Sequence, residues 1–386
     1  MKQKKTVSLE TFVALFVIIG VFVCIGQVMG LGNMFNTLMN TAHDLLINTC
    51  FFIMAISVVT GALSNLFAEF GVIDLMNKII SPLMRPIYGL PGAASLGVVT
   101  TFISDNAAVL SLTKNEKIKG FFKEYQIPLL CNLGTSFGMG LILVTYMLGM
   151  PINGALQASL TGVLGAVIGS IVSVGLMRRA TIKAYNVPKA EVKADRSIKS
   201  FRKQENTMRE INGSTLERVL NAMLEGGKTG VDLGFAIVPG VVFICTFVMM
   251  LTFGPAESGI YTGDAYQGIA LLPKFGEVIQ PITNILFGFK DPSAIAFPIT
   301  SLGATGAAMA LVPSMIASGA AGLNEIAVFT AMGMCWSGYL STHISMMDAL
   351  EKREFIKSAL LSHTIGGLCA GVSAHYLCIL FGMAAF

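Results

Sequence analysis

The chain of 386 residues is 54% hydrophobic and only 12% charged, whereas ordinary soluble domains carry about 25% charged residues. Its 41 glycines are typical of packed transmembrane helices, and its net charge of +4 comes from short connecting segments. This composition excludes a soluble globular domain. The scattered basic residues exclude a nucleic-acid-binding face, so no nucleic acid is expected as a partner.

Seven apolar runs reach the length of about 20 residues that a helix needs to cross a bilayer. They span residues 11–31, 45–66, 127–148, 153–177, 230–251, 324–346 and 358–381. The first run is too long for a signal-peptide core and has no Ala-x-Ala cleavage site, so we interpret it as a retained helix.

One stretch of the chain is repeated 199 positions later, at residues 79–110 and 278–309. Both copies are apolar, are interrupted by Gly and Pro near their middles and are too long for one simple span. Paired broken segments in the two halves of a membrane chain indicate a transport site. The identical pairs are Ile80 and Ile279, Pro82 and Pro281, Gly89 and Gly288, Thr101 and Thr300, and Ala108 and Ala307.

The distribution of positive charge predicts the orientation of these segments. If each copy crosses the membrane an even number of times, 22 of the 26 Lys and Arg residues fall on one side, which is expected to be the cytoplasm. A re-entrant hairpin and a pair of short spans both satisfy this count. In the hairpin interpretation the second copy opens to the outside, and its tip lies at residues 288–293.

The sequence therefore predicts an all-α polytopic membrane protein built from two inverted repeats. Each repeat contains a helix, a broken re-entrant hairpin and two helices. The predicted parts are an N-terminal transmembrane helix with its outer connection (1–44), a first repeat (45–177), a cytoplasmic loop with an amphipathic helix (178–228) and a second, inverted repeat (229–386). The N-terminus is expected in the cytoplasm and the C-terminus outside, in a cell inner membrane.

Two local patterns add detail. Ser214 and Glu217 form a capping box before an apolar stripe that ends at Gly226-Gly227, which predicts an interfacial helix or a soluble linker helix. Gly165 and Gly169 share a helix face and permit close packing, either inside the protomer or between protomers. A homo-oligomer is left open.

Asp105 is the most informative acid, because a carboxylate at bilayer depth is costly and is usually functional. With Ser104, Thr101 and Ser136 it is a candidate cation site, although a wetted ion pair near Lys114 would also explain it. Asn106, Asn132 and Thr135 are candidate solute ligands.

In the second half the candidate solute ligands are Thr300, Ser301 and Ser337. Asp291 caps the helix after the predicted tip or lies deep in the membrane, and His343 relays protons or packs. The seven cysteines lie in apolar runs and the four histidines are scattered, so no metal, cofactor or enzymatic chemistry is predicted.

The stretch 45–150 resembles the nucleoside-recognition, or Gate, domain. The resemblance rests on Gly61, Gly71, Ser81-Pro82, the run Gly89-Leu-Pro-Gly92 and the polar Ser-Asp-Asn break. The second half resembles a divergent, reversed copy. Gate domains occur in concentrative nucleoside transporters and in spore maturation proteins A and B.

The resemblance implies a site for solute and cation between two opposed hairpins. We see no counterpart of the base-reading Gln-Thr-Glu cluster or of the ribose-binding glutamate of the nucleoside transporters. The sequence predicts an ion-coupled secondary transporter of a small polar solute, with nucleoside-like solutes among the candidates and sodium or a proton as coupling ion. The alternative is a non-transport Gate-domain component of a larger membrane assembly.

Overall fold

The computed structural model describes residues 7–103, 121–195, 213–256, 258–337 and 339–384. Every regular element in these ranges is helical, which confirms the all-α prediction. Six helices are long and apolar enough to cross a membrane within the described chain. They are Leu9–Met29, Leu31–Glu69, Glu124–Leu148, Ala155–Ala184, Thr215–Thr252 and Arg353–Leu380. The chain is therefore a multi-pass membrane protein.

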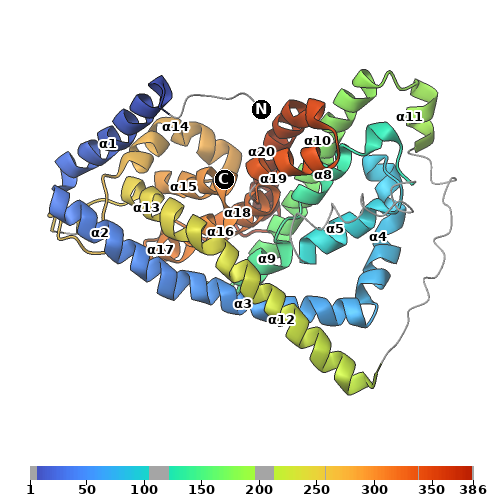
Figure 1. The fold of residues 1–386 in the computed structure, drawn as a ribbon, viewed down its shortest axis with the longest axis horizontal. Helices are drawn as coiled ribbons and strands as arrows, with labels where there is room; N and C mark the ends of the chain where they lie inside the picture. The colour runs from blue at the N-terminus through green and yellow to red at the C-terminus, as the bar shows by residue number, and fades with distance from the viewer. Residues whose placement is uncertain (1–6, 104–120, 196–212, 257, 338, 385–386) are drawn as a thin grey trace.

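The N-terminal helix α1 (Leu9–Met29) exposes most of its large apolar side chains, as a helix facing lipid would. The predicted outer connection after it is mostly helical. Helix α2 (Leu31–Asp44) continues through the π-helix η1 (Leu45–Cys50) into α3 (Phe51–Glu69). The lower edge of Figure 1 shows this long rod in blue.

In each copy of the repeated stretch a 17-residue helix ends at a short turn, after which the described chain returns in shorter helices. Helices α4 (Val72–Tyr88) and α14 (Leu271–Phe287) both have 17 residues and begin 199 positions apart. Each ends at a glycine in the left-handed region, Gly89 with φ 67° and Gly288 with φ 70°. A residue without Cβ is favoured at this helix-ending position, which explains why both glycines recur in the repeat.

The chain returns from each turn through short helices. In the first half the returning helix is α5 (Ala94–Ile103). In the second half the 3-10 turn η5 (Pro292–Ile295) leads into α15 (Ala296–Gly303), α16 (Thr305–Met309) and α17 (Val312–Ala317). The predicted turn at residues 288–293 is thus where the hairpin bends. Its re-entrant insertion into the membrane stays a prediction.

Two predicted spans are broken near their middles. The first consists of η2 (Glu124–Gln126), α8 (Leu129–Thr135) and α9 (Gly140–Leu148), with Met139 in the left-handed region at the break. The run predicted at 324–346 is α18 (Leu323–Cys335) and α19 (Tyr339–Ala349), so it is two short helices rather than one span. A side chain of another helix satisfies a carbonyl next to this second break, since Thr305 Oγ1 of α16 donates a hydrogen bond to the Gly333 carbonyl at 2.9 Å.

A second long rod crosses the first. Helix α12 (Thr215–Pro239) continues through the π-helix η4 (Gly240–Cys245) into α13 (Thr246–Thr252). At the crossing, a Cβ on Gly226 would lie 2.2 Å from the Gly61 carbonyl oxygen of α3. Figure 1 shows α12 crossing α3.

The predicted amphipathic helix is the first part of α12 and leads into the next span, and its interfacial placement stays a prediction. The capping box is present, because Ser214 N donates to Glu217 Oε2 at 2.7 Å and Glu217 N donates to Ser214 Oγ at 3.4 Å. The helix does not stop at Gly226-Gly227, however. Gly226 provides close approach to another backbone instead of a helix end.

The closing helices of the two halves, α10 (Ala155–Ala184) and α20 (Ile356–Leu380), pack against each other at the centre of the molecule. A Cβ on Gly165 would lie 2.7 Å from the Ala370 carbonyl, and one on Gly169 would lie 2.5 Å from the Gly366 carbonyl. Gly165 and Gly169 of α10 thus pack inside the protomer, which was one of the two predicted alternatives.

The predicted loop 178–228 is partly helical. Helix α10 extends to Ala184, and α11 (Lys189–Asp195) folds back beside the first hairpin, at the right of Figure 1. The loop therefore begins later than the apolar pattern indicated, because α10 continues beyond its apolar part into the basic stretch.

Candidate functional site

A cavity of about 520 Å³ lies at the tip of the second hairpin. The hairpin contributes Gly288, Lys290 and Asp291, the start of α18 contributes Asn324 and Glu325, and α20 contributes His375. The other walls are residues 319–323 and Met383 and Ala384. A concave site with a few convergent polar groups is where a small ligand is expected to bind.

Asn324 connects the three elements that form this cavity. Its Nδ2 donates to the Phe287 carbonyl at 2.8 Å, and His375 Nδ1 lies 2.7 Å from its Oδ1. The amide oxygen can only accept, so Nδ1 of His375 carries a proton in this orientation of the amide. One side chain thereby fixes the last turn of α14 and the end of α20 against the start of α18.

Glu325 places a nearly buried carboxylate in the cavity wall. Its Oε2 accepts from Gly322 N at 2.9 Å, and its Oε1 accepts from Asn324 Nδ2 at 3.3 Å. The carboxylate lies in the first turn of α18, where the helix dipole favours negative charge. The cavity wall thus holds an acid whose carboxylate is fixed by a backbone donor and by a side-chain amide.

Asp291 and Lys290 form the hairpin side of the cavity. Asp291 Oδ1 accepts from Ser293 N at 2.8 Å and from Ser293 Oγ at 2.6 Å, which confirms the capping interpretation of this acid. Gln280 Nε2 donates to the Lys290 carbonyl at 2.8 Å and steadies the turn. The wall therefore offers acids, a lysine, an amide and an imidazole, a set suited to a solute with both donors and acceptors.

The sequence analysis missed Asn324, Glu325 and His375 as site residues. A signal was present, because an acid and an amide begin the apolar run 324–346. Ionisable residues inside predicted spans are functional candidates by default. Glu325 is hard to recognise as a site residue from the sequence because it lies at the start of an otherwise apolar run.

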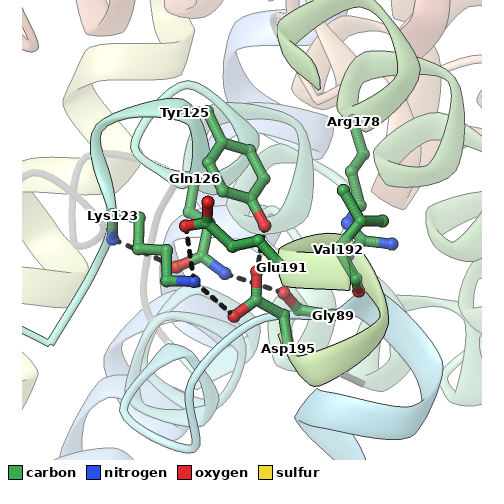
Figure 2. Close-up of polar contacts among 8 residues, drawn as sticks. All are labelled: Gly89, Lys123, Tyr125, Gln126, Arg178, Glu191, Val192 and Asp195. Carbon is green, nitrogen blue, oxygen red and sulfur yellow. Dashed lines mark hydrogen bonds and ion pairs between the residues drawn. The ribbon is translucent and has the colours of Figure 1, made fainter. Parts of the chain in front are cut away.

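The first hairpin tip is anchored in the same way. Gln126 Nε2 donates to the Gly89 carbonyl at 2.9 Å (Figure 2), and Asn324 Nδ2 donates to the carbonyl of Phe287, the residue before Gly288. The Arg178 guanidinium of α10 lies against Gly89, where a Cβ would be 2.6 Å from its Cζ. His375 of α20 occupies the equivalent place at Gly288, 2.4 Å from a Cβ there.

Helix α11 covers the first tip (Figure 2). Lys123 Nζ forms ion pairs with Glu191 at 2.8 Å and with Asp195 at 2.9 Å. The hydroxyl of Tyr125 donates to Asp195, and Arg178 Nη2 donates to the Val192 carbonyl at 3.1 Å. Desolvation lowers the pKa of Lys123, but the hydrogen bonds and charges of Glu191 and Asp195 outweigh it and raise the pKa above its usual value.

The predicted ligands of the first half are buried and bonded inside the protein. Thr101 Oγ1 donates to the Gly97 carbonyl at 2.6 Å, and Ser136 Oγ donates to the Asn132 carbonyl at 2.8 Å. Thr135 donates to the carbonyl of Cys131 in its own helix. Ser104, Asp105 and Asn106 lie outside the described residues.

The second-half candidates share this environment. Thr300 Oγ1 donates to the Ala296 carbonyl at 2.7 Å, and Ser301 Oγ donates to the Phe297 carbonyl at 2.9 Å. Ser337 is buried at the break between α18 and α19. None of the seven described candidates lines the 520 Å³ cavity, and their roles stay predictions.

Asn132 takes part in a buried network that joins the two halves. Its Nδ2 donates to Ser173 Oγ at 3.0 Å and to the Ala359 carbonyl at 3.1 Å. Ser173 Oγ lies 2.9 Å from Nδ1 of His363, whose ring centroid is 4.5 Å from that of His343. His343 is fully buried, as its packing interpretation requires. The network ties α8 and α10 to α19 and α20.

Comparison with known proteins supports the fold. No protein-family model matches the chain. The structure is similar to that of a double variant of CNTnw, a concentrative nucleoside transporter, in an outward-facing state. The TM-score is 0.54 with 14% sequence identity, over 96% of this chain and 86% of that one. The chain thus has the fold of a concentrative nucleoside transporter.

A sequence relative is known from Alkalihalophilus pseudofirmus, an uncharacterized protein that is 21% identical over 238 residues. The match covers 60% of this chain and 50% of the relative, so it spans only half of the relative's length.

Proposed function

We propose that the protein is an ion-coupled secondary transporter that moves a small polar solute across the membrane by alternating access. The observation that carries the proposal is the 520 Å³ polar cavity at the second hairpin tip. The fold likeness to CNTnw supports it, since that protein was solved in an outward-facing state. Nucleosides are the first solutes to test because of this likeness.

The solute is proposed to bind between the tip of the second hairpin and the start of α18. Glu325 and Asp291 would accept hydrogen bonds from hydroxyl or amino groups, and Lys290 would donate to carbonyl oxygens. Asn324 and His375 would orient the solute indirectly, since their polar groups hold the tip in place. A solute with several hydroxyl groups fits this wall better than an apolar one.

The coupling ion is proposed to bind in the first half, with Asp105 as its carboxylate ligand and sodium or the proton as the ion. The support is the cost of an ionisable group at bilayer depth. Asp105→Asn should abolish uptake that is driven by an ion gradient in proteoliposomes. Normal gradient-driven uptake by this variant would rule out the coupling role.

A thermal-shift screen of the purified protein tests the solute site. Nucleosides, amino acids and sugars are added with sodium or with choline, at pH 5.5 and 7.5, because a ligand that binds only the folded state raises the unfolding temperature. A stabilising solute should then enter proteoliposomes down an imposed gradient. Binding without uptake would favour a non-transport component over a transporter.

Two variants locate the binding. Glu325→Gln replaces the acid in the cavity wall by a neutral amide. The solute concentration that gives the same rise in unfolding temperature should increase at least about tenfold, which corresponds to one lost charged hydrogen bond. Glu277→Gln is the control, because Glu277 is an exposed acid on helix α14 of the same hairpin. If both variants respond like the wild type, the solute binds elsewhere.

A further inference from the structure

The first hairpin tip is closed by a piece of the connection between the two halves. Helix α11 lies over this tip, where the second tip has its cavity. We propose that α11 is a cover that the chain supplies to itself, and that it must undock before the first tip can open. The purpose of the cover rests on the proposed transport function, but its docking is measurable without any solute.

Three side chains of the first half hold α11, and each belongs to the structure that supports the tip. Lys123 and Tyr125 come just before Gln126, whose amide donates to the Gly89 carbonyl. Their partners on α11 are Glu191 and Asp195. The same short stretch of backbone therefore binds the tip on one side and the cover on the other.

Arg178 makes this connection direct. Its guanidinium lies against Gly89, so closely that a Cβ there would be 2.6 Å from Cζ, and its Nη2 donates to the Val192 carbonyl of α11. A displacement of Gly89 would push the guanidinium against α11. Undocking of α11 would remove the acceptor that holds the guanidinium in place. Tip and cover are thus mechanically coupled through one side chain.

The ion pairs that hold α11 on the first tip are weak enough to break during undocking. The side chains of Lys123 and Glu191 are 42% and 40% exposed, and partly solvated ion pairs contribute little to stability.

Hydrogen–deuterium exchange on the full-length protein in nanodiscs tests the proposal. The variant Glu191→Gln/Asp195→Asn removes both carboxylates of α11 and leaves the tip unchanged. Amides of residues 189–195 should exchange about tenfold faster, because docked α11 loses two ion pairs and keeps only a neutral acceptor for the Tyr125 hydroxyl. Amides of residues 89–95 should also exchange faster, since the tip is released with the cover.

Two further variants complete the design. Lys123→Gln removes the cationic partner of Glu191 and Asp195, and it should likewise speed exchange in residues 189–195 and in residues 89–95. Asp348→Asn breaks a comparable surface ion pair, with Arg353, away from the tip and should change neither segment. Faster exchange in α11 with an unchanged tip would overturn the role of cover, and so would unchanged exchange in both segments. Because no solute is involved, either result would leave the transport proposal standing.

Discussion

At both hairpin tips a 17-residue helix ends at a left-handed glycine, and a buried amide from the next broken helix holds the turn. A nitrogen-bearing side chain from the closing helix then packs on the glycine. The residues in these two roles are Gln126 and Arg178 at the first tip and Asn324 and His375 at the second. The repeat therefore preserves an anchoring scheme while its residue types diverge.

The tips differ in what lies above them. The second faces a cavity of about 520 Å³, and the first faces α11. The cover does not come from either repeated stretch but from the connection between the halves. The two tips thus differ in two ways: a segment of the connection lies over the first tip, and the backbones that return from the two turns have different helices.

Substitution of the two tip glycines should give the largest loss of stability and compares how tightly each tip is packed. Gly89→Ala and Gly288→Ala each place a Cβ at positive φ and into a packed side chain, which should cost about 2–4 kcal/mol of unfolding free energy. Gly89→Ala should cost more, because Arg178 is held between the glycine and α11, whereas His375 borders a cavity into which its ring can turn.

Denaturant unfolding in detergent micelles measures these costs. Gly20→Ala is the control, because no atom lies within 4 Å of a Cβ at this position of α1. It should be neutral or slightly stabilising, since alanine favours a helix over glycine. A larger cost for Gly288→Ala than for Gly89→Ala would contradict the view that the first tip is the more tightly closed.

A smaller effect is expected from the amide anchors. Asn324→Leu leaves the Phe287 carbonyl and His375 Nδ1 without their partner, at a cost of about 2–3 kcal/mol. Gln126→Leu removes the bond to Gly89 and should cost a similar amount if the two anchors are equivalent. Thermal unfolding of both variants compares them.

Asn40→Leu separates the effect of burial from that of hydrogen bonding. Asn40 donates to the Gly263 carbonyl at 2.9 Å in a partly exposed place, where water can replace the lost bond. Its substitution should cost less than about 1 kcal/mol. Equal losses in all three variants would show that the tip amides are ordinary surface contacts and not anchors.

Much of this architecture was predictable because it depends on local chemistry. Gly89 and Gly288 are recognisable in the sequence, since a helix end in the left-handed region favours glycine wherever the repeat is copied. The capping box at Ser214 also depends on neighbours three residues apart. Apolar length predicted six of the seven spans for the same reason, whereas the run predicted at 324–346 is two short helices.

The candidate site was less predictable because it depends on contacts between distant segments. Thr300 and Ser301 look like ligands in the sequence, yet their hydroxyl groups donate to carbonyls of their own helix. Asn324 and His375 meet across 51 positions, which no local pattern indicates. Gly226 shows the same limit, since only the packing of α3 reveals that it marks a crossing and not a helix end.

The smallest expected effect concerns the pH dependence of the cover. The pKa of Lys123 is raised by Glu191 and Asp195, so its contribution is complete below the ordinary lysine pKa of 10.5 and is lost as the pH rises through the higher folded value. A nitroxide on Ala190→Cys, an exposed position of α11, should therefore become mobile only above about pH 10.5. Global stability should change by less than about 1 kcal/mol, because the pair is partly solvated.

Lys123→Gln provides the matched comparison for this titration. The nitroxide should already be mobile at pH 7 in that variant, and its mobility should not change further between pH 9 and 11 because the titrating ammonium is absent. A label that stays immobile in Lys123→Gln would mean that Tyr125 and Arg178 alone hold α11. The ion pairs would then be a consequence of docking and not its cause, and the asymmetry between the tips would rest on the Arg178 contact with Gly89.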